Sequence, residues 1–445
     1  MSKDMYRDSR VEFTKEMKDK YTILFPTMLP IHFTMMTNIF NSAGFNCVML
    51  DTEGKKVVDA GLENVHNDTC YPALLVIGQM IDALDTGEYD LDKVALMITQ
   101  TGGGCRASNY IHLLRKALKN RGYGHIPIIS LNFNGMEKNS GFKLSAPMLI
   151  KLIYTILMGD FIMSIQNQCL PYEVIPGSTN AVCDKWVGKF SDYVCSSTLI
   201  SYKKVKQFYR EILNDFAALD LKDEKRVKVG IVGEIYVKYS KLGNNNLESF
   251  LISEGAEVVV PGLLDFCLYC VENGRVDRSL YGGKYLANAG MTIAYNYLVK
   301  KQQDMIDIIN EHGKFAPPTS FDITRKLAGE YINKGVKMGE GWLLTAEMAE
   351  LIHAGVENIV CTQPFGCLPN HIVAKGKMRL IKEKHPEANI VAIDYDPGAT
   401  KVNQENRLKL MLSIAEKSNF TEKLSKEDLQ MEPMPELVTA GAYSK

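Results

Sequence analysis

The chain has 445 residues, a formal net charge of -1 at pH 7 and 46% hydrophobic residues, a balance that is typical of a soluble globular protein. A single hydrophobic core stops growing well below this length, so we expect two or three domains. The 51 basic and 52 acidic residues nearly cancel, and no lysine- or arginine-rich block stands out. This argues against a nucleic-acid partner.

The sequence also argues against membrane association and export. The longest apolar run, residues 146–165, is interrupted by Lys151 and by Gly159 and Asp160, so it falls short of the roughly 20 apolar residues that span a bilayer. The N-terminus carries no apolar segment suited to export. We therefore expect a cytoplasmic protein, in which the ten cysteines stay reduced. Most are expected to be small buried hydrophobes.

Short apolar runs alternate with helical patterns in two parts of the chain. In residues 21–145 the runs lie at 21–26, 46–50, 94–99 and 126–131, and helical patterns lie at 31–43, 73–84 and 107–119. In residues 226–425 the runs lie at 227–232, 257–261, 358–362 and 389–395, with helices at 247–254 and 346–354. This alternation predicts an α/β protein with two parallel-sheet lobes, each covered by helices.

Three further segments complete the predicted organisation. Residues 1–20 form an N-terminal extension, residues 146–225 a mainly helical middle segment, and residues 426–445 a C-terminal tail. A helical insertion at about residues 285–337 interrupts the second lobe, with Pro317 and Pro318 marking a break inside it.

Three cysteines lie where predicted strands end and predicted helices begin, which is where ligands gather in open α/β sheets. Cys105 follows the run at 94–99 in TGGGC, Cys367 follows the run at 358–362 in QPFGC, and Cys70 precedes a helix in HNDTCYP. A helix N-terminus offers free backbone N–H groups and a partial positive charge. Both favour the thiolate form that binds iron.

Other residues near these cysteines suit the surroundings of an iron–sulfur cluster. Glycines allow backbone amides to approach cluster sulfides, and a histidine can donate to a sulfide or to a substrate. These candidates are Gly103, Gly104, Gly366, His66 and His371. The histidines can equally be surface or capping residues.

The cysteines also have simpler interpretations. The glycine loop before Cys105 is of a kind that can hold phosphate, although Arg106 follows in place of the GK[ST] ending of a P-loop. Cys70 and Cys367 can be an ordinary first-turn residue and a packed thiol. A second tier of candidate ligands comprises the C-x-x-C pair Cys267 and Cys270, which stands in an apolar run, and Cys361.

Several separated segments together resemble the 2-hydroxyglutaryl-CoA dehydratase D-component family. They are, in order, HNDTCYPALLVIGQM, TGGGCRASNY, SEGAEVVVP, GEGWLL, QPFGCLPNHIVAKGK and IDYDPGATKVNQENR. The likeness is closest to the dehydratase-like C-terminal part of large acyl-CoA dehydratase activase proteins. It covers the chain from about residue 21 to about residue 412.

The resemblance implies two flavodoxin-like lobes with an oxygen-sensitive 4Fe–4S cluster between them, bound by Cys70, Cys105 and Cys367 and keeping one iron open to substrate. It implies a 2-hydroxyacyl-CoA dehydratase type of lyase with an acyl-CoA substrate. Low-potential electrons would come from a separate ATP-hydrolysing iron–sulfur activator, since this chain shows no P-loop. The subunit would pair with itself or with a related chain.

Three alternatives stay open. The first is an ATP-dependent reductase with a double-cubane 8Fe–9S cluster, in which Cys267 and Cys270 supply extra thiolates. The second is a noncatalytic electron relay whose cluster is fully ligated by cysteine. The third is a metal-free binding module of flavodoxin-like fold.

Overall fold

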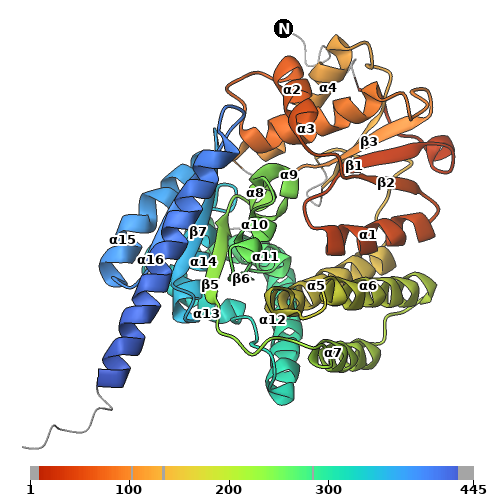
Figure 1. Ribbon diagram of the computed structural model, residues 1–445. Helices are drawn as coiled ribbons and strands as arrows, with labels where there is room; N and C mark the ends of the chain where they lie inside the picture. The colour runs from red at the N-terminus through yellow and green to blue at the C-terminus, as the bar shows by residue number, and fades with distance from the viewer. Residues whose placement is uncertain (1–9, 102–103, 133–135, 283–284, 429–445) are drawn as a thin grey trace, which may run out of the picture.

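A computed structural model of the chain describes residues 10–101, 104–132, 136–282 and 285–428 (Figure 1). These residues form two four-stranded sheets, all of whose strand pairs are parallel, flanked by helices. The predicted α/β class with two parallel-sheet lobes is therefore confirmed.

The first lobe contains β1 (Thr22–Pro26), β2 (Asn46–Leu50), β3 (Val94–Thr99) and β4 (Ile128–Leu131), in the sheet order β2-β1-β3-β4. Each of these strands lies on a predicted apolar run. The helical elements are η1 (Lys15–Met17), α1 (Pro30–Ser42), α2 (Lys55–Asn64), α3 (Tyr71–Asp85), η2 (Arg106–Ser108) and α4 (Tyr110–Asn120).

The second lobe repeats this order as β6-β5-β7-β8. Its strands are β5 (Val227–Gly233), β6 (Ala256–Val259), β7 (Asn358–Pro364) and β8 (Asn389–Tyr395). Its helical elements are α8 (Ile235–Tyr239), α9 (Lys241–Asn244), α10 (Leu247–Ser253), α14 (Trp342–His353), η4 (Asn370–Ala374), η5 (Lys375–Lys377), α15 (Met378–Lys384) and α16 (Lys401–Asp428). In such sheets the ligand crevice lies at the carboxyl ends of the two central strands, here β1 and β3, and β5 and β7.

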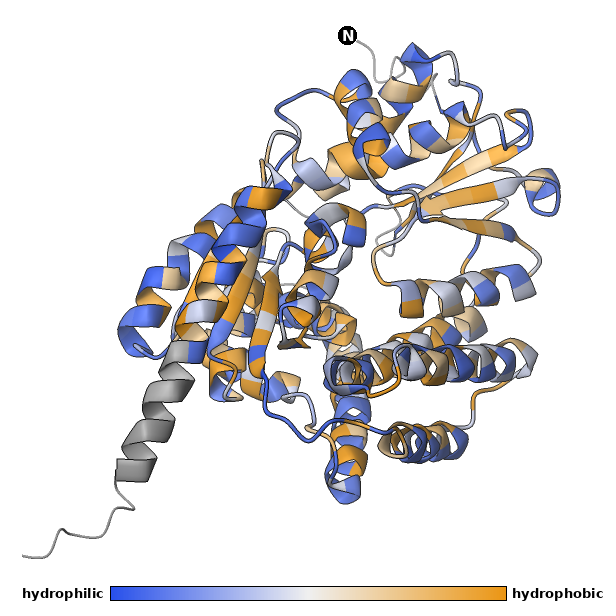
Figure 2. Cartoon of the chain, in the orientation of Figure 1, coloured by the Kyte–Doolittle hydropathy of each residue, from blue (hydrophilic) through white to orange (hydrophobic). Residues whose placement is uncertain are grey.

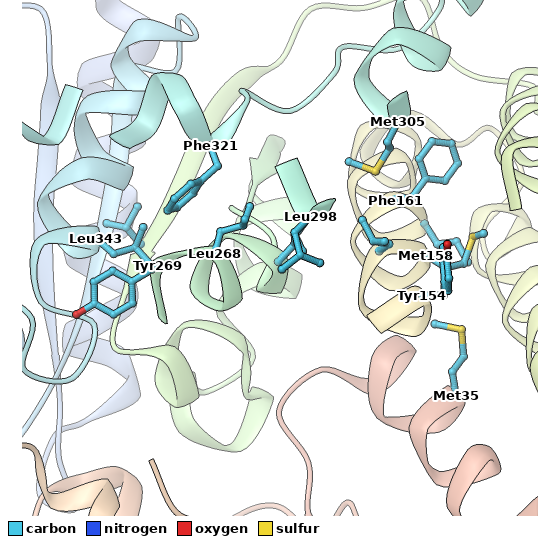
Figure 3. Packing of buried hydrophobic residues seen from close by; sticks show 14 of the residues in the cluster. Met35, Tyr154, Met158, Phe161, Leu268, Tyr269, Leu298, Met305, Phe321 and Leu343 are labelled. Carbon is cyan, nitrogen blue, oxygen red and sulfur yellow. The ribbon is translucent and has the colours of Figure 1, made fainter. Parts of the chain in front are cut away.

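Helices fill the region next to both sheets. The middle of the chain forms α5 (Ala146–Cys169), η3 (Leu170–Tyr172), α6 (Ser178–Ser196) and α7 (Tyr202–Ala217), and the later helices are α11 (Leu263–Tyr281), α12 (Tyr285–His312) and α13 (Phe321–Ala328). Buried side chains from α1, α5, α11, α12, α13 and α14 share one hydrophobic cluster (Figure 3). This core ties the middle helices to both lobes.

The stretch Ala146–Tyr172 is the one helical stretch in the described residues that is long and apolar enough to cross a membrane. It has 61% of its most apolar window buried, and α5 packs against α1, α6 and α7. Figure 2 shows hydrophobic residues concentrated on the strands and on inward helix faces, with polar residues outside. These features fit the core helix of a soluble protein.

A buried hydrogen-bonded cluster joins α1, α5 and α11. The Asp160 carboxylate in α5 accepts hydrogen bonds from the backbone amides of Leu263 and Leu264, each at 2.8 Å, and so caps the start of α11. Its Oδ1 also lies 2.8 Å from Nε2 of His32, a fully buried residue of α1. One carboxylate thus connects the first lobe, the middle helices and the helix that follows β6.

Replacing Asp160 by alanine is expected to lower the free energy of unfolding by about 3 kcal/mol, because two amides and a buried imidazole lose their acceptor. Denaturant unfolding followed by circular dichroism measures this change. The control is Asp192→Ala, at an exposed position of α6, which is expected to change stability by less than about 0.5 kcal/mol. Equal stability of the two variants would contradict the role assigned to Asp160.

Candidate metal centre

The structure places the three principal cysteines at the starts of helical segments. Cys70 is the N-cap residue of α3, and Cys105 is the N-cap residue of η2, in the loop after β3. Cys367 follows β7 and stands shortly before η4. Cys70 and Cys367 are buried, and Cys105 is half-buried.

One of these sulfurs accepts a hydrogen bond from the helical segment that its cysteine precedes. The amide of Ala107 donates to Cys105 Sγ at 3.3 Å. Burial raises the pKa of the Cys70 and Cys367 thiols, and the backbone amides of Ala73 and Asn370 act on them in the opposite direction. A nearby amide donor favours a thiolate over a thiol. Each cysteine therefore has a helix amide that favours its thiolate form.

Direct contacts bring the three cysteine loops together across the two lobes. The Tyr71 amide at the start of α3 donates to the Phe365 carbonyl after β7 at 3.0 Å. A Cβ atom placed on Gly366 would lie 3.0 Å from the Cα of Cys70. A Cβ atom placed on Gly339 would lie 3.6 Å from the Cβ of Cys105 and 3.2 Å from the Cγ of Pro369, close to Cys367.

Burial keeps the three thiols neutral in the metal-free protein. Burial is the largest cause that raises the pKa of each thiol, and it raises that of Cys105 to about 11. The carboxylates of Glu340 and Glu234 act on both Cys105 and Cys367 in the same direction. A bound metal displaces thiol protons, so metal binding here would release protons.

Two buried glutamates from the second lobe lie within electrostatic range of these thiols. Glu234 directly follows β5, and its Oε2 accepts from the Val237 amide at 2.8 Å. Glu340 Oε1 accepts from the Ile235 amide at 3.0 Å. Burial raises the pKa of both carboxyl groups, and the charge of Glu340 raises that of Glu234 further. This pair therefore holds a proton more readily than a solvated glutamate does.

Sequence reasoning missed part of this site. Neither Glu340 nor Glu234 is predicted from the sequence, although the position of Glu234 directly after a strand is a usable signal. Tyr110 was also missed: it opens α4, and its Oη lies 3.0 Å from Cys70 Sγ.

Of the glycines and histidines predicted to surround a cluster, some lie close to the cysteines and others are exposed. Gly366 adopts φ +70° against Cys70, and a Cβ atom on Gly104 would lie 3.0 Å from Met338 Sδ. Gly103 lies outside the described residues. His66 and His371 are exposed, and His66 Nδ1 accepts from the Asp68 amide, as expected of a capping histidine.

The second-tier cysteines lie on two elements of the second lobe. Cys361 is fully buried inside β7, where its thiol donates to Asn370 Oδ1 at 3.6 Å. Cys267 and Cys270 lie on α11, half-buried and exposed respectively. Desolvation and the Glu340 carboxylate raise the pKa of the Cys270 thiol to about 12. The Glu340 carboxylate therefore raises the pKa of Cys270 as it does those of Cys105 and Cys367.

Among the described residues, no three His, Cys, Asp or Glu side chains gather as ligands of a single metal ion would. Cysteines that bind a cubane attach to separate irons and surround a larger volume. Three cysteine thiols are donors of the kind that iron–sulfur clusters use, and the Cys105 sulfur accepts a hydrogen bond from a helix amide. This donor chemistry is compatible with an iron–sulfur cluster.

Comparison of the chain with protein-family models finds no match, and neither does comparison with curated proteins. Membership of the dehydratase family stays a prediction from the sequence motifs. The function has to be argued from the site.

In the metal-free protein, Cys105 is expected to react with iodoacetamide about 300-fold more slowly at pH 7 than free cysteine does, because the thiolate is the reactive form and a pKa of about 11 makes it scarce. The rate should keep rising with pH and level off near pH 11. Mass spectrometry of the Cys105 peptide measures it. A plateau near the ordinary thiol pKa of about 8.5 would contradict the assigned environment.

Proposed function

We propose that this chain is the cluster-bearing component of an enzyme of the 2-hydroxyacyl-CoA dehydratase type, with an iron–sulfur cluster on Cys70, Cys105 and Cys367. The observation that supports the proposal is the meeting of three cysteine loops from two lobes, each cysteine at the start of a helical segment. A thiol with a purely structural role requires neither a position at a helix start nor two other cysteine loops nearby.

A cluster with three cysteine ligands supplies one-electron chemistry and an iron that can bind substrate. The chain's own residues would supply the rest. The helix amides at Cys70, Cys105 and Cys367 stabilise the thiolates. The Glu234 and Glu340 carboxyl groups hold a proton beside them, and removal of a hydroxyl group as water requires a proton.

The proposal includes an ATP-hydrolysing iron–sulfur activator as electron donor, an acyl-CoA substrate, a cytoplasmic location and pairing with a second copy or a related subunit. The surface beside the three cysteines has the apolar character of a protein-binding surface. Phe365, Leu368 and Ile372, which flank Cys367, are exposed, as is Met338, which contacts Gly104. Clustered exposed apolar side chains typically mark a surface that another protein covers.

Protein purified without oxygen is expected to contain about four iron and four sulfide per chain and to give an EPR signal on reduction. Cys105→Ala and Cys367→Ala should lose most of the iron while staying folded, because each removes one ligand. Chemical iron analysis and circular dichroism measure both properties. The matched control is Cys195→Ala, at a half-buried thiol of α6. Full iron content in both ligand variants would refute the proposed site.

A second candidate is a double-cubane 8Fe–9S reductase. The observation that favours it is the position of Cys270, whose thiol is affected by the same Glu340 carboxylate as Cys105 and Cys367. Cys270 therefore stands within electrostatic range of the glutamate that borders the first site.

Removing both α11 thiols separates the two candidates. With a single cubane, the Cys267→Ala, Cys270→Ala double variant should keep the wild-type iron content, about four per chain, because neither thiol is a ligand. A wild-type content of about eight irons that falls by about half in the double variant would establish the double-cubane alternative. Iron analysis and EPR spectra of both proteins give the answer.

A further inference from the structure

Tyr110 makes a side-chain contact with one of the proposed ligands. Its Oη lies 3.0 Å from Cys70 Sγ, and the residue is buried at the start of α4, the helix that follows Cys105. Among the described residues, Cys70 is the one of the three proposed ligands whose sulfur shows a hydrogen bond to a side-chain hydroxyl.

The direction of this hydrogen bond follows from the chemistry of the two groups. A phenol has an ordinary pKa of about 10 and keeps its proton at neutral pH. A metal-bound thiolate has no proton to give. In the cluster-loaded protein, Tyr110 is therefore the donor and Cys70 Sγ the acceptor.

We propose that Tyr110 is a positioning residue that raises the reduction potential of the cluster site by donating a hydrogen bond to the Cys70 thiolate. The inference rests on the proposed function and names a residue that sets one of its properties. Reduction adds one electron, supplied by the activator, and part of the added charge falls on the ligand sulfurs. A donor stabilises the more negative state more strongly. Tyr110 keeps its proton, and no bond is made or broken.

Burial gives this contact its effect. Tyr110 and Cys70 are both buried, so little water is present to screen the hydrogen bond that the hydroxyl donates. Removing it should leave a site that needs a stronger reductant.

The test is Tyr110→Phe, which keeps the buried ring and removes the hydroxyl. The control is Tyr123→Phe, since Tyr123 Oη donates at 2.7 Å to Asp85 and contacts none of the proposed ligands through that hydroxyl. Both variants and the wild type are loaded without oxygen, titrated with a titanium(III) reductant, and followed by EPR. We expect unchanged iron content in all three, and a more negative midpoint potential in Tyr110→Phe alone.

Each other outcome is decisive. Full iron content with an unchanged potential in Tyr110→Phe overturns the inference and leaves the proposed function standing. Absence of iron from the wild type overturns both. If Tyr110→Phe folds but loses iron, alkylation of the metal-free protein decides: a slower reaction at Cys70 relative to Cys105 supports the donor, and an unchanged ratio overturns it. An unfolded variant overturns the inference in favour of a structural role.

Discussion

The site depends on one close contact between the lobes, where the loop after β7 meets the first turn of α3. The Tyr71 amide donates to the Phe365 carbonyl there, and the Cα of Cys70 approaches Gly366 so closely that a Cβ atom would lie 3.0 Å away. Gly366 also has φ +70°, a backbone conformation that residues other than glycine rarely adopt. A larger residue would push Cys70 away from Cys367. Two cysteines on separate lobes become neighbours because glycine stands at this point.

Closing this contact buries ionisable groups. Each buried group then either pairs with an opposite charge or keeps its neutral form. Lys238 and Glu347 form a buried ion pair at 2.8 Å, because an unpaired charge there would be costly. In the part of the chain that the structure describes, neither Glu234 nor Glu340 forms an ion pair, and burial raises the pKa of both carboxyl groups. The thiols of Cys70, Cys105 and Cys367 likewise have raised pKa values because they are buried. The charge of the site therefore depends on whether metal has replaced the thiol protons.

The sequence predicts the fold well where local pattern decides it. All eight strands fall on apolar runs, since strands buried on both faces are apolar throughout. It misses α2, whose stability comes from packing: a Cβ atom on Gly61 would lie 2.4 Å from the Leu74 carbonyl of α3. The positions of Cys105 and Cys367 were predictable from strand ends, and that of Cys70 from the start of a helix. Tyr110 and the Ile235 partner of Glu340 were not, because only tertiary structure brings these contacts together.

The two lobes share a sheet order but contribute different chemistry. The first lobe supplies Cys70, Cys105 and the Tyr110 hydroxyl, and the second supplies Cys367 and both buried glutamates. Any movement that parts the lobes would therefore separate Cys367 from Cys70 and Cys105, and both carboxyl groups from the two sulfurs of the first lobe. The spacing, electrostatic interactions and solvent exposure of these groups would all change in one step. The Asp160 cluster, which joins α1 of the first lobe to α11 after β6, resists that movement.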